Sequence, residues 1–144
     1  MHNHRSIIVA HIDFQRAFDA ISHSKLIYKL SHYGIGGNLL FWIQAFLTNR
    51  SQCVKLNNSL SDFLPISSGV PQGSVIGPLL FTLFINDLTD MFDSSTTSKL
   101  FADDIKIYSE ISINCNLDMF QIHLDAIHNW AKFGKSAFLS QNAT

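Results

Sequence analysis

The sequence has little excess charge of either sign. It contains 10 Lys and Arg residues against 11 Asp and Glu residues, so its formal net charge is −1. A domain that binds nucleic acid by itself usually carries a basic stripe, because much of its affinity comes from contacts with phosphates. The near-neutral balance therefore argues against a self-sufficient nucleic-acid-binding protein. It argues less against one part of a larger assembly whose basic parts lie elsewhere.

Cysteines and long apolar runs are also scarce. Cys53 and Cys115 are the only two cysteines and form no CxxC motif, so the sequence predicts no disulfide framework and we expect a reduced, intracellular protein. The longest apolar run, residues 75–85, contains a glycine and a proline and is too short to span a bilayer. Residues 1–14 hold only a brief apolar stretch, shorter than the core of a signal peptide. We therefore expect no membrane role.

What the sequence does contain is a large apolar fraction whose spacing changes along the chain. Hydrophobic residues make up 47% of the 144 residues and charged residues 15%, which is typical of a compact globular domain. Alternating or β-branched segments indicate strands, and apolar residues at helical spacing indicate helices. The predicted strands are residues 6–12, 53–56, 60–66, 97–101 and 105–108, and the predicted helices are residues 14–21, 38–49, 74–92 and 113–133. A further predicted helix is capped by Ser22 or Ser24 and ends before Gly34. Helices mixed with two mostly antiparallel hairpins predict an α+β fold.

Three aspartates stand where a metal could be held. Asp13 ends the strand predicted for residues 6–12, and Asp103 and Asp104 are adjacent at the tip of the second hairpin. Carboxylates that gather in one place repel one another, so a site that collects them usually holds a cation. Mg²⁺ prefers carboxylate oxygens, and a pair of such ions can clamp the attacking and leaving oxygens of a phosphoryl transfer. The alternative is that Asp103 and Asp104 are ordinary turn residues.

A loop rich in glycine leads into the helix predicted for residues 74–92. Residues 68–78 read Ser-Gly-Val-Pro-Gln-Gly-Ser-Val-Ile-Gly-Pro. Glycines at 69, 73 and 77 let the backbone approach a ligand or a neighbouring strand closely. A loop that opens into a helix N-terminus suits contacts with phosphate or sugar. The alternative is a loop-to-helix transition whose glycines serve only packing.

Three short segments, taken in their order along the chain, form a far more specific signal than each does alone. Residues 12–19 read Ile-Asp-Phe-Gln-Arg-Ala-Phe-Asp, the loop at residues 68–78 follows, and residues 101–104 read Phe-Ala-Asp-Asp. In this order they resemble motifs A, B and C of the reverse transcriptases of non-LTR (LINE-like) retrotransposons. The resemblance extends over about residues 5–133 and implies an RNA-directed DNA polymerase. It also implies that the α+β fold is a polymerase palm, with a mostly antiparallel sheet packed against helices.

The resemblance implies roles for the matched acidic residues. Asp13 and Asp103 would be the principal ligands of two Mg²⁺ ions, for which Mn²⁺ is an alternative, and Asp104 would be the adjacent carboxylate. Phe14 would offer its backbone carbonyl to a metal. The reaction would be attack of a primer 3′-OH on the α-phosphate of a deoxynucleotide, with release of pyrophosphate, and the protein would contribute positioning and charge stabilisation.

The resemblance also implies which residues contact the nucleotide. Phe18, five residues beyond Asp13, falls where the family places a steric gate against the ribose 2′-OH, the group that separates ribonucleotides from deoxyribonucleotides. Gln72 would contact the incoming nucleotide, and Gly73 would keep that loop close to it. The alternative for Phe18 is plain core packing, and we expect Asp19 to act as a local cap.

We therefore predict a partial reverse transcriptase palm over residues 1–133, followed by a divergent, poorly ordered tail over residues 134–144. The expected partners are an RNA template, a DNA primer and a deoxynucleotide, bound by the full-length enzyme. We expect the fingers and thumb to be missing, which would leave a preserved catalytic centre without independent activity. Two other hypotheses remain: an inactive relic palm that serves as an interaction module, and the palm of another template-copying polymerase, such as an intron-encoded reverse transcriptase.

Overall fold

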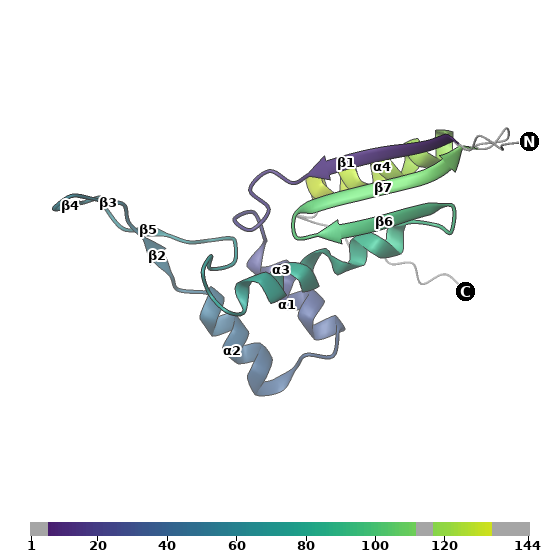
Figure 1. Ribbon diagram of the computed structural model, residues 1–144. Coiled ribbons are helices and arrows are strands. Elements are labelled where there is room, and N and C mark those ends of the chain that lie inside the picture. The colour runs from purple at the N-terminus through teal and green to yellow at the C-terminus, as the bar shows by residue number, and fades with distance from the viewer. Residues whose placement is uncertain (1–5, 112–116, 134–144) are drawn as a thin grey trace, which may run out of the picture. The chain divides into compact units, whose positions relative to one another are not determined.

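The computed structural model describes residues 6–111 and 117–133 (Figure 1). The described residues divide into two compact units, of which the first comprises residues 6–15, 85–111 and 117–133 and the second residues 16–84. The first unit is built on an antiparallel sheet and the second mainly on helices, which confirms the α+β class. The predicted tail at residues 134–144, Cys115 and the first turn of the helix predicted from residue 113 lie outside the described residues.

The sheet of the first unit has three antiparallel strands in the order β1-β7-β6. Its strands are β1 (Ser6–Asp13), β6 (Thr96–Phe101) and β7 (Asp104–Ile111). β1 pairs with β7 in an unbroken register that runs from Ser6 opposite Ile111 to Asp13 opposite Asp104. The predicted strand at residues 6–12 and the second predicted hairpin are thus confirmed, each slightly longer than expected.

Helix α4 (Leu117–Phe133) packs against one face of this sheet. Ile105 and Ile107 are fully buried while Asp104 and Lys106, which alternate with them on β7, are exposed, and this is the alternation expected of a sheet covered on one side. On the covered face, the buried His123 of α4 shares a hydrogen bond of 3.0 Å between its Nδ1 and the Oγ1 of Thr96. The opposite face of the sheet is therefore open, and it carries the odd-numbered residues of β1.

The second unit is built around three helices. These are α1 (His23–His32), α2 (Gly37–Leu47) and α3 (Gly77–Ile85). Leu26 and Leu30 of α1 and Leu47 of α2 are fully buried, as the helical spacing predicted. The ammonium group of the buried Lys29 donates a hydrogen bond of 2.6 Å to the carbonyl oxygen of Phe84 and lies 4.5 Å from the centroid of its ring. This contact ties α1 to the C-terminal end of α3, where a cation is favourable.

The first predicted hairpin is present but is interrupted. Its strands form two short ladders, β2 (Ser51–Gln52) with β5 (Leu64–Pro65) and β3 (Lys55–Leu56) with β4 (Ser59–Leu60). The sequence had predicted two continuous strands, at residues 53–56 and 60–66, whereas the structure has shorter strands with breaks between them.

The short helix predicted for residues 14–21 was wrong. This segment is a series of turns, and Arg16 has a left-handed φ of 54° that ends any helical run. Two carbonyl groups that a helix would use internally instead accept hydrogen bonds from the 68–78 loop: Val70 N–H donates to the oxygen of Phe18, and Gly69 N–H donates to that of Ile21. Tertiary hydrogen bonds thus outweigh local helix propensity here.

The helix predicted for residues 74–92 was partly wrong. The α-helical part begins only at Gly77, because the Ser74 hydroxyl accepts the Gly77 N–H at 3.0 Å and so caps the helix. Beyond Ile85 the chain continues as a 3₁₀ helix, η1 (Asn86–Met91). The prediction had merged a capped turn, an α-helix and a 3₁₀ helix into one element.

Candidate active site

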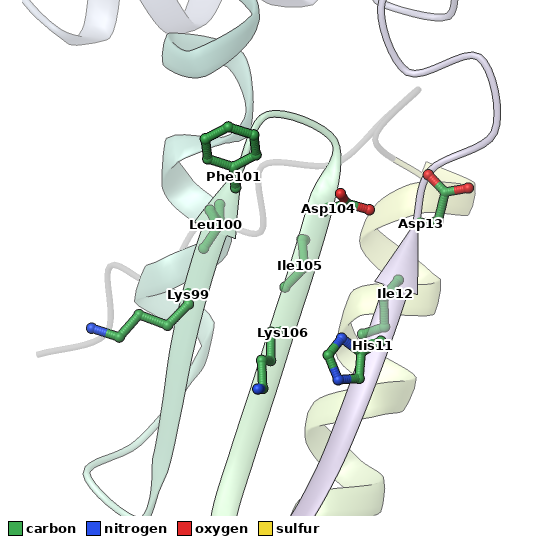
Figure 2. A pocket seen from close by; sticks show the side chains of 9 residues that line it. All are labelled: His11, Ile12, Asp13, Lys99, Leu100, Phe101, Asp104, Ile105 and Lys106. Atoms are coloured by element: carbon green, nitrogen blue, oxygen red, sulfur yellow. The ribbon is translucent and has the colours of Figure 1, made fainter.

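Two of the predicted metal ligands face each other across the sheet. Asp13 ends β1, Asp104 begins β7, and the two residues are direct partners in the antiparallel register. Direct partners have Cα atoms about 4.5–5.5 Å apart and project their side chains from the same face. Both side chains are exposed, and Figure 2 shows the two carboxylates side by side at the end of the open face. We refer to Asp13 and Asp104 as the acidic pair.

Asp103 lies beside the acidic pair, in the turn between β6 and β7. The turn is tight, because Phe101 and Asp104 are already paired and only Ala102 and Asp103 connect them. Ala102 has a φ of 51°, a conformation that disfavours residues other than glycine. Within residues 6–111 and 117–133, no three His, Cys, Asp or Glu side chains gather into a group that could hold a metal. The structure thus brings together Asp13 and Asp104, with Asp103 adjacent along the chain.

The acidic pair has the chemistry that a hard cation needs. Neither carboxylate makes a hydrogen bond or ion pair with another described residue, so their oxygens are available on an open surface. Like charges directly opposite on neighbouring strands destabilise a sheet, and a cation between them would remove that repulsion. Mg²⁺ is commonly bound by one or two carboxylates together with substrate phosphates. Two exposed carboxylates therefore fit a site completed by a phosphate-bearing substrate.

The acidic pair forms one end of a cavity of about 390 Å³ on the first unit. The cavity is lined by His11, Asp13, Lys99, Phe101, Asp104 and Lys106, among others (Figure 2). Phe101 is 83% exposed, although apolar rings are usually covered. Carboxylates, basic side chains and an open aromatic ring thus share one small surface.

Phe14 follows Asp13 directly and anchors the end of β1. Its ring lies 5.6 Å from that of Trp130 on α4, measured between centroids. This packing fixes the backbone next to Asp13, including the carbonyl group that the resemblance assigns to a metal.

The predicted nucleotide contacts lie in the second unit, on segments without regular structure. The turn at residues 16–20 and the loop at residues 68–78 are held together by backbone hydrogen bonds and by the Ser68 hydroxyl, which donates to the carbonyl oxygen of Asp19 at 2.8 Å. Gly69, at φ +87°, sits so close that a Cβ there would lie 2.8 Å from the Cα of Asp19. A glycine is therefore required at position 69, because two backbone segments approach each other closely there, as the sequence suggested.

Phe18, Gln72 and Gly73 are placed differently within that unit. The Phe18 ring stacks on the buried ring of Phe81, with centroids 4.2 Å apart, and it is only partly covered. The Gln72 side-chain amide donates a hydrogen bond of 2.9 Å to the carboxylate of Asp19. Asp19 therefore orients Gln72, whereas the N-cap residue of α1 is Ser22. Gly73 has a φ of +79° and open space around it.

Sequence reasoning missed the basic residues of the cavity and the ring beneath Phe18. Strand alternation could have identified His11, Lys99 and Lys106, because each lies two residues from Asp13, Phe101 or Asp104 on the same face. The Phe18–Phe81 stack joins residues far apart in the sequence, and no local pattern indicates it.

Comparison with known proteins finds similarity to one family and to several of its relatives. The family described as reverse transcriptase (RNA-dependent DNA polymerase) matches residues 1–140. The chain is 32% identical over 139 residues to the RNA-directed DNA polymerase from mobile element jockey of Drosophila melanogaster, covering 92% of this chain and 15% of that protein. It is 33% identical over 134 residues to the probable RNA-directed DNA polymerase from transposon BS of the same organism, covering 84% and 14%.

A third relative is the Retrovirus-related Pol polyprotein from type-2 retrotransposable element R2DM of Drosophila melanogaster. It is 30% identical over 122 residues, covering 76% of this chain and 11% of that protein. The chain thus spans between 11% and 15% of the length of these three relatives. Within the described residues, none of the helices has both the length and the apolar character needed to cross a membrane.

Proposed function

Because this chain belongs to the reverse transcriptase family, we propose that it forms the catalytic palm of a retrotransposon RNA-directed DNA polymerase. In this proposal Asp13, Asp103 and Asp104 hold two Mg²⁺ ions, or Mn²⁺ in their place, and the Phe14 carbonyl contributes a further oxygen. The substrates are a deoxynucleotide, a DNA primer and an RNA template, bound with the help of fingers and a thumb. The supporting observation is the register that sets Asp13 opposite Asp104 on an open sheet face.

The residues of the first unit would position the metal ions. β1 and β7 fix the acidic pair through their hydrogen-bonded ladder, and the Phe14–Trp130 contact holds the backbone that follows. When bound, divalent ions supply charge stabilisation for the attacking 3′-OH and the departing pyrophosphate. The share of the protein is therefore to hold carboxylate oxygens at fixed positions next to an open surface, which preorganises the site.

The residues of the second unit would select the nucleotide. Phe18 is backed by Phe81, so its ring cannot easily retreat from a bulky 2′-OH. The Asp19 carboxylate holds the amide nitrogen of Gln72, which leaves the amide oxygen to accept a hydrogen bond from a sugar hydroxyl. A ribonucleotide would then be rejected by contact with Phe18, whereas a deoxynucleotide would fit.

A Mg²⁺ titration of the purified chain tests the metal site. In EDTA, Asp104→Asn should raise the stability slightly, by about 0.2–1 kcal/mol, because it removes the repulsion within the acidic pair. In 10 mM Mg²⁺ the order should reverse, since the original chain gains about 1.4 kcal/mol if its Kd is about 1 mM, and the variant gains little. Thermal unfolding monitored by circular dichroism measures both effects. Asp62→Asn, which removes an exposed aspartate of the second unit, is the matched control.

The position of the metal can be tested separately with Fe²⁺. When Fe²⁺ replaces Mg²⁺, ascorbate and peroxide generate hydroxyl radicals that cut the backbone beside the bound ion. We expect cleavage near residues 13 and 104, suppressed by excess Mg²⁺ and absent in Asp104→Asn. Cleavage confined to other segments, or a Mg²⁺ response that Asp13→Asn and Asp104→Asn leave intact, would refute the proposed metal site.

Primer extension by the isolated chain should fail. Template and primer bind mainly through phosphate contacts, and this chain has a net charge of −1. Purified protein with Mg²⁺, a primed RNA template and deoxynucleotides should therefore give no product on a sequencing gel. Robust extension that Asp103→Ala abolishes would contradict this prediction, although it would support the assignment of the catalytic carboxylates.

The second candidate is an inactive palm that binds a partner protein. It is favoured by the large apolar side chains that α2 exposes, since Phe41 is 70% and Trp42 53% exposed. The Mg²⁺ titration separates the two functions. A stability that does not respond to Mg²⁺ would favour the interaction module.

A further inference from the structure

A row of basic side chains crosses the open face of the sheet next to the acidic pair. Lys106 of β7 is the direct partner of His11 on β1 and of Lys99 on β6, so the three side chains stand side by side across three strands. All three are exposed, and all line the cavity at one end of which the acidic pair lies (Figure 2). We refer to His11, Lys99 and Lys106 as the basic row.

The spacing of the basic row suits an extended anion. Neighbouring strands are about 5 Å apart, so the row is about 10 Å long, and two residues along a strand place it about 7 Å from the acidic pair. Lysine ammonium groups bind phosphate as mobile point charges, and an imidazole can donate a hydrogen bond to the same oxygens. A single small anion would engage one or two of these groups, whereas a chain of phosphates can engage all three.

The basic row also places like charges next to each other, which lowers the stability of the sheet. Lys99 and Lys106 are like charges in direct cross-strand pairing, which destabilises a sheet. Neither lysine makes a hydrogen bond or ion pair with another described residue, so nothing in the described chain offsets this repulsion by direct contact. A bound polyanion would offset it, just as a cation would offset the repulsion within the acidic pair.

We propose that the basic row binds the phosphate backbone of the nucleic-acid strand whose 3′ end lies at the acidic pair. This inference rests on the proposed function, because it takes the acidic pair as the place where that end reacts. Base pairing plays no part in the contact, so the row would hold the strand regardless of sequence. The row supplies locally the positive charge that the chain as a whole lacks.

The test is a binding measurement made without metal, so that it does not depend on catalysis. A fluorescently labelled DNA primer annealed to a short RNA template is titrated with the chain in EDTA, at several salt concentrations, and its anisotropy is followed. The double variant Lys99→Gln/Lys106→Gln should bind about 10-fold more weakly at low salt. Its plot of log affinity against log salt should also lose about 1.5–2 units of slope, because two phosphate contacts are removed.

Three further variants control this result. Lys132→Gln removes an exposed lysine from α4, on the covered side of the sheet, and should change the affinity by less than 2-fold. Lys99→Arg/Lys106→Arg should restore binding, which a loss of folding would not permit. Asp104→Asn should bind the duplex more tightly in EDTA while losing its response to Mg²⁺. Failure of the metal site and failure of the basic row would therefore be seen in different measurements.

Competition experiments identify the anion. If unlabelled duplex competes and the glutamine variants remove that competition, the proposal is supported. If pyrophosphate or a deoxynucleotide competes equally well at matched phosphate concentration, the basic row is a binding site for free polyphosphate and the proposal is overturned. Equal competition by poly-glutamate would point instead to an acidic protein segment and would overturn it too, as would an unchanged affinity in the glutamine variants.

Discussion

The two units of this chain position their candidate site residues in different ways. In the first unit, the acidic pair and the basic row project from the same face of a regular antiparallel sheet, two residues apart along the strands. In the second unit, Phe18 and Gln72 lie on turns that are joined by a few backbone hydrogen bonds and by individual side-chain contacts. A strand ladder distributes its stability over many equivalent hydrogen bonds, whereas irregular segments depend on a few special residues. Single substitutions should therefore harm the second site more than the first.

The largest effect is expected from Phe81, which supports Phe18. Its side chain is only 2% exposed, so Phe81→Ala should lower the free energy of unfolding by about 3–5 kcal/mol through lost burial and a new cavity. Urea denaturation followed by circular dichroism measures this change. Phe101→Ala is the matched control in the first unit, because that ring is 83% exposed, and it should stay within about 0.5 kcal/mol.

If Phe81→Ala does not fold, Phe81→Leu keeps the comparison measurable, with an expected loss of about 1–2 kcal/mol. Similar losses for Phe81→Leu and Phe101→Ala would mean that the Phe18–Phe81 stack adds little to the second unit.

A slightly smaller effect is expected from the close approach at Gly69. A Cβ at Gly69 would lie 2.8 Å from the Cα of Asp19 and 2.9 Å from the oxygen of Phe18, in a backbone already at φ +87°. Gly69→Ala should therefore destabilise the fold by about 2–4 kcal/mol, combining left-handed strain with overpacking. The same denaturation assay measures it.

Gly73→Ala separates these two causes. Gly73 has a similar φ of +79°, but a Cβ added there would meet no heavy atom within 4 Å, so only strain of about 1 kcal/mol remains. Equal losses at both glycines would show that the two backbone segments do not need their close contact.

The same contrast explains how much could be predicted from the sequence. The strand ending at Asp13 was predicted from its β-branched and apolar residues, and the hairpin carrying Asp103 and Asp104 from two short strand-like segments around a turn. The resemblance to reverse transcriptases predicted that these three aspartates come together in space. The sheet places two of them, Asp13 and Asp104, opposite each other. Regular elements were predictable because their periodicity is local.

The irregular site was not predictable in the same way. Residues 14–21 contain good helix formers, but Arg16 adopts a left-handed φ because the neighbouring backbone pairs with the 68–78 loop. The bond between Asp19 and Gln72 spans more than fifty positions, and a local sequence pattern contains no information about it. The register between strands is not a local pattern either. Alternation within each strand could have indicated the exposed face of each basic residue, but only the pairing of β1, β7 and β6 shows that the basic row stands side by side.

The smallest effect is expected from Asp93. It tests whether a turn in the first unit also depends on one side chain. Asp93 precedes β6, and its carboxylate accepts hydrogen bonds from the hydroxyl and the backbone N–H of Ser95. Chiefly the hydroxyl bond, and then the backbone bond, lower the pKa of Asp93 below its ordinary value of 3.8. Because the folded pKa is depressed, this stabilisation is present above about pH 4 and is lost as the pH falls through the folded pKa.

Asp93→Asn keeps an oxygen acceptor in the turn but removes the titrating charge. The drop in melting temperature between pH 6 and pH 3 should therefore be slightly smaller in Asp93→Asn than in the original chain. Asp90→Asn, which changes an exposed aspartate of η1, should leave the drop closer to its original size. If the two variants give the same pH dependence, the turn before β6 does not depend on the Asp93 charge. The reliance on single polar side chains would then be confined to the second unit, which would sharpen the contrast between the two.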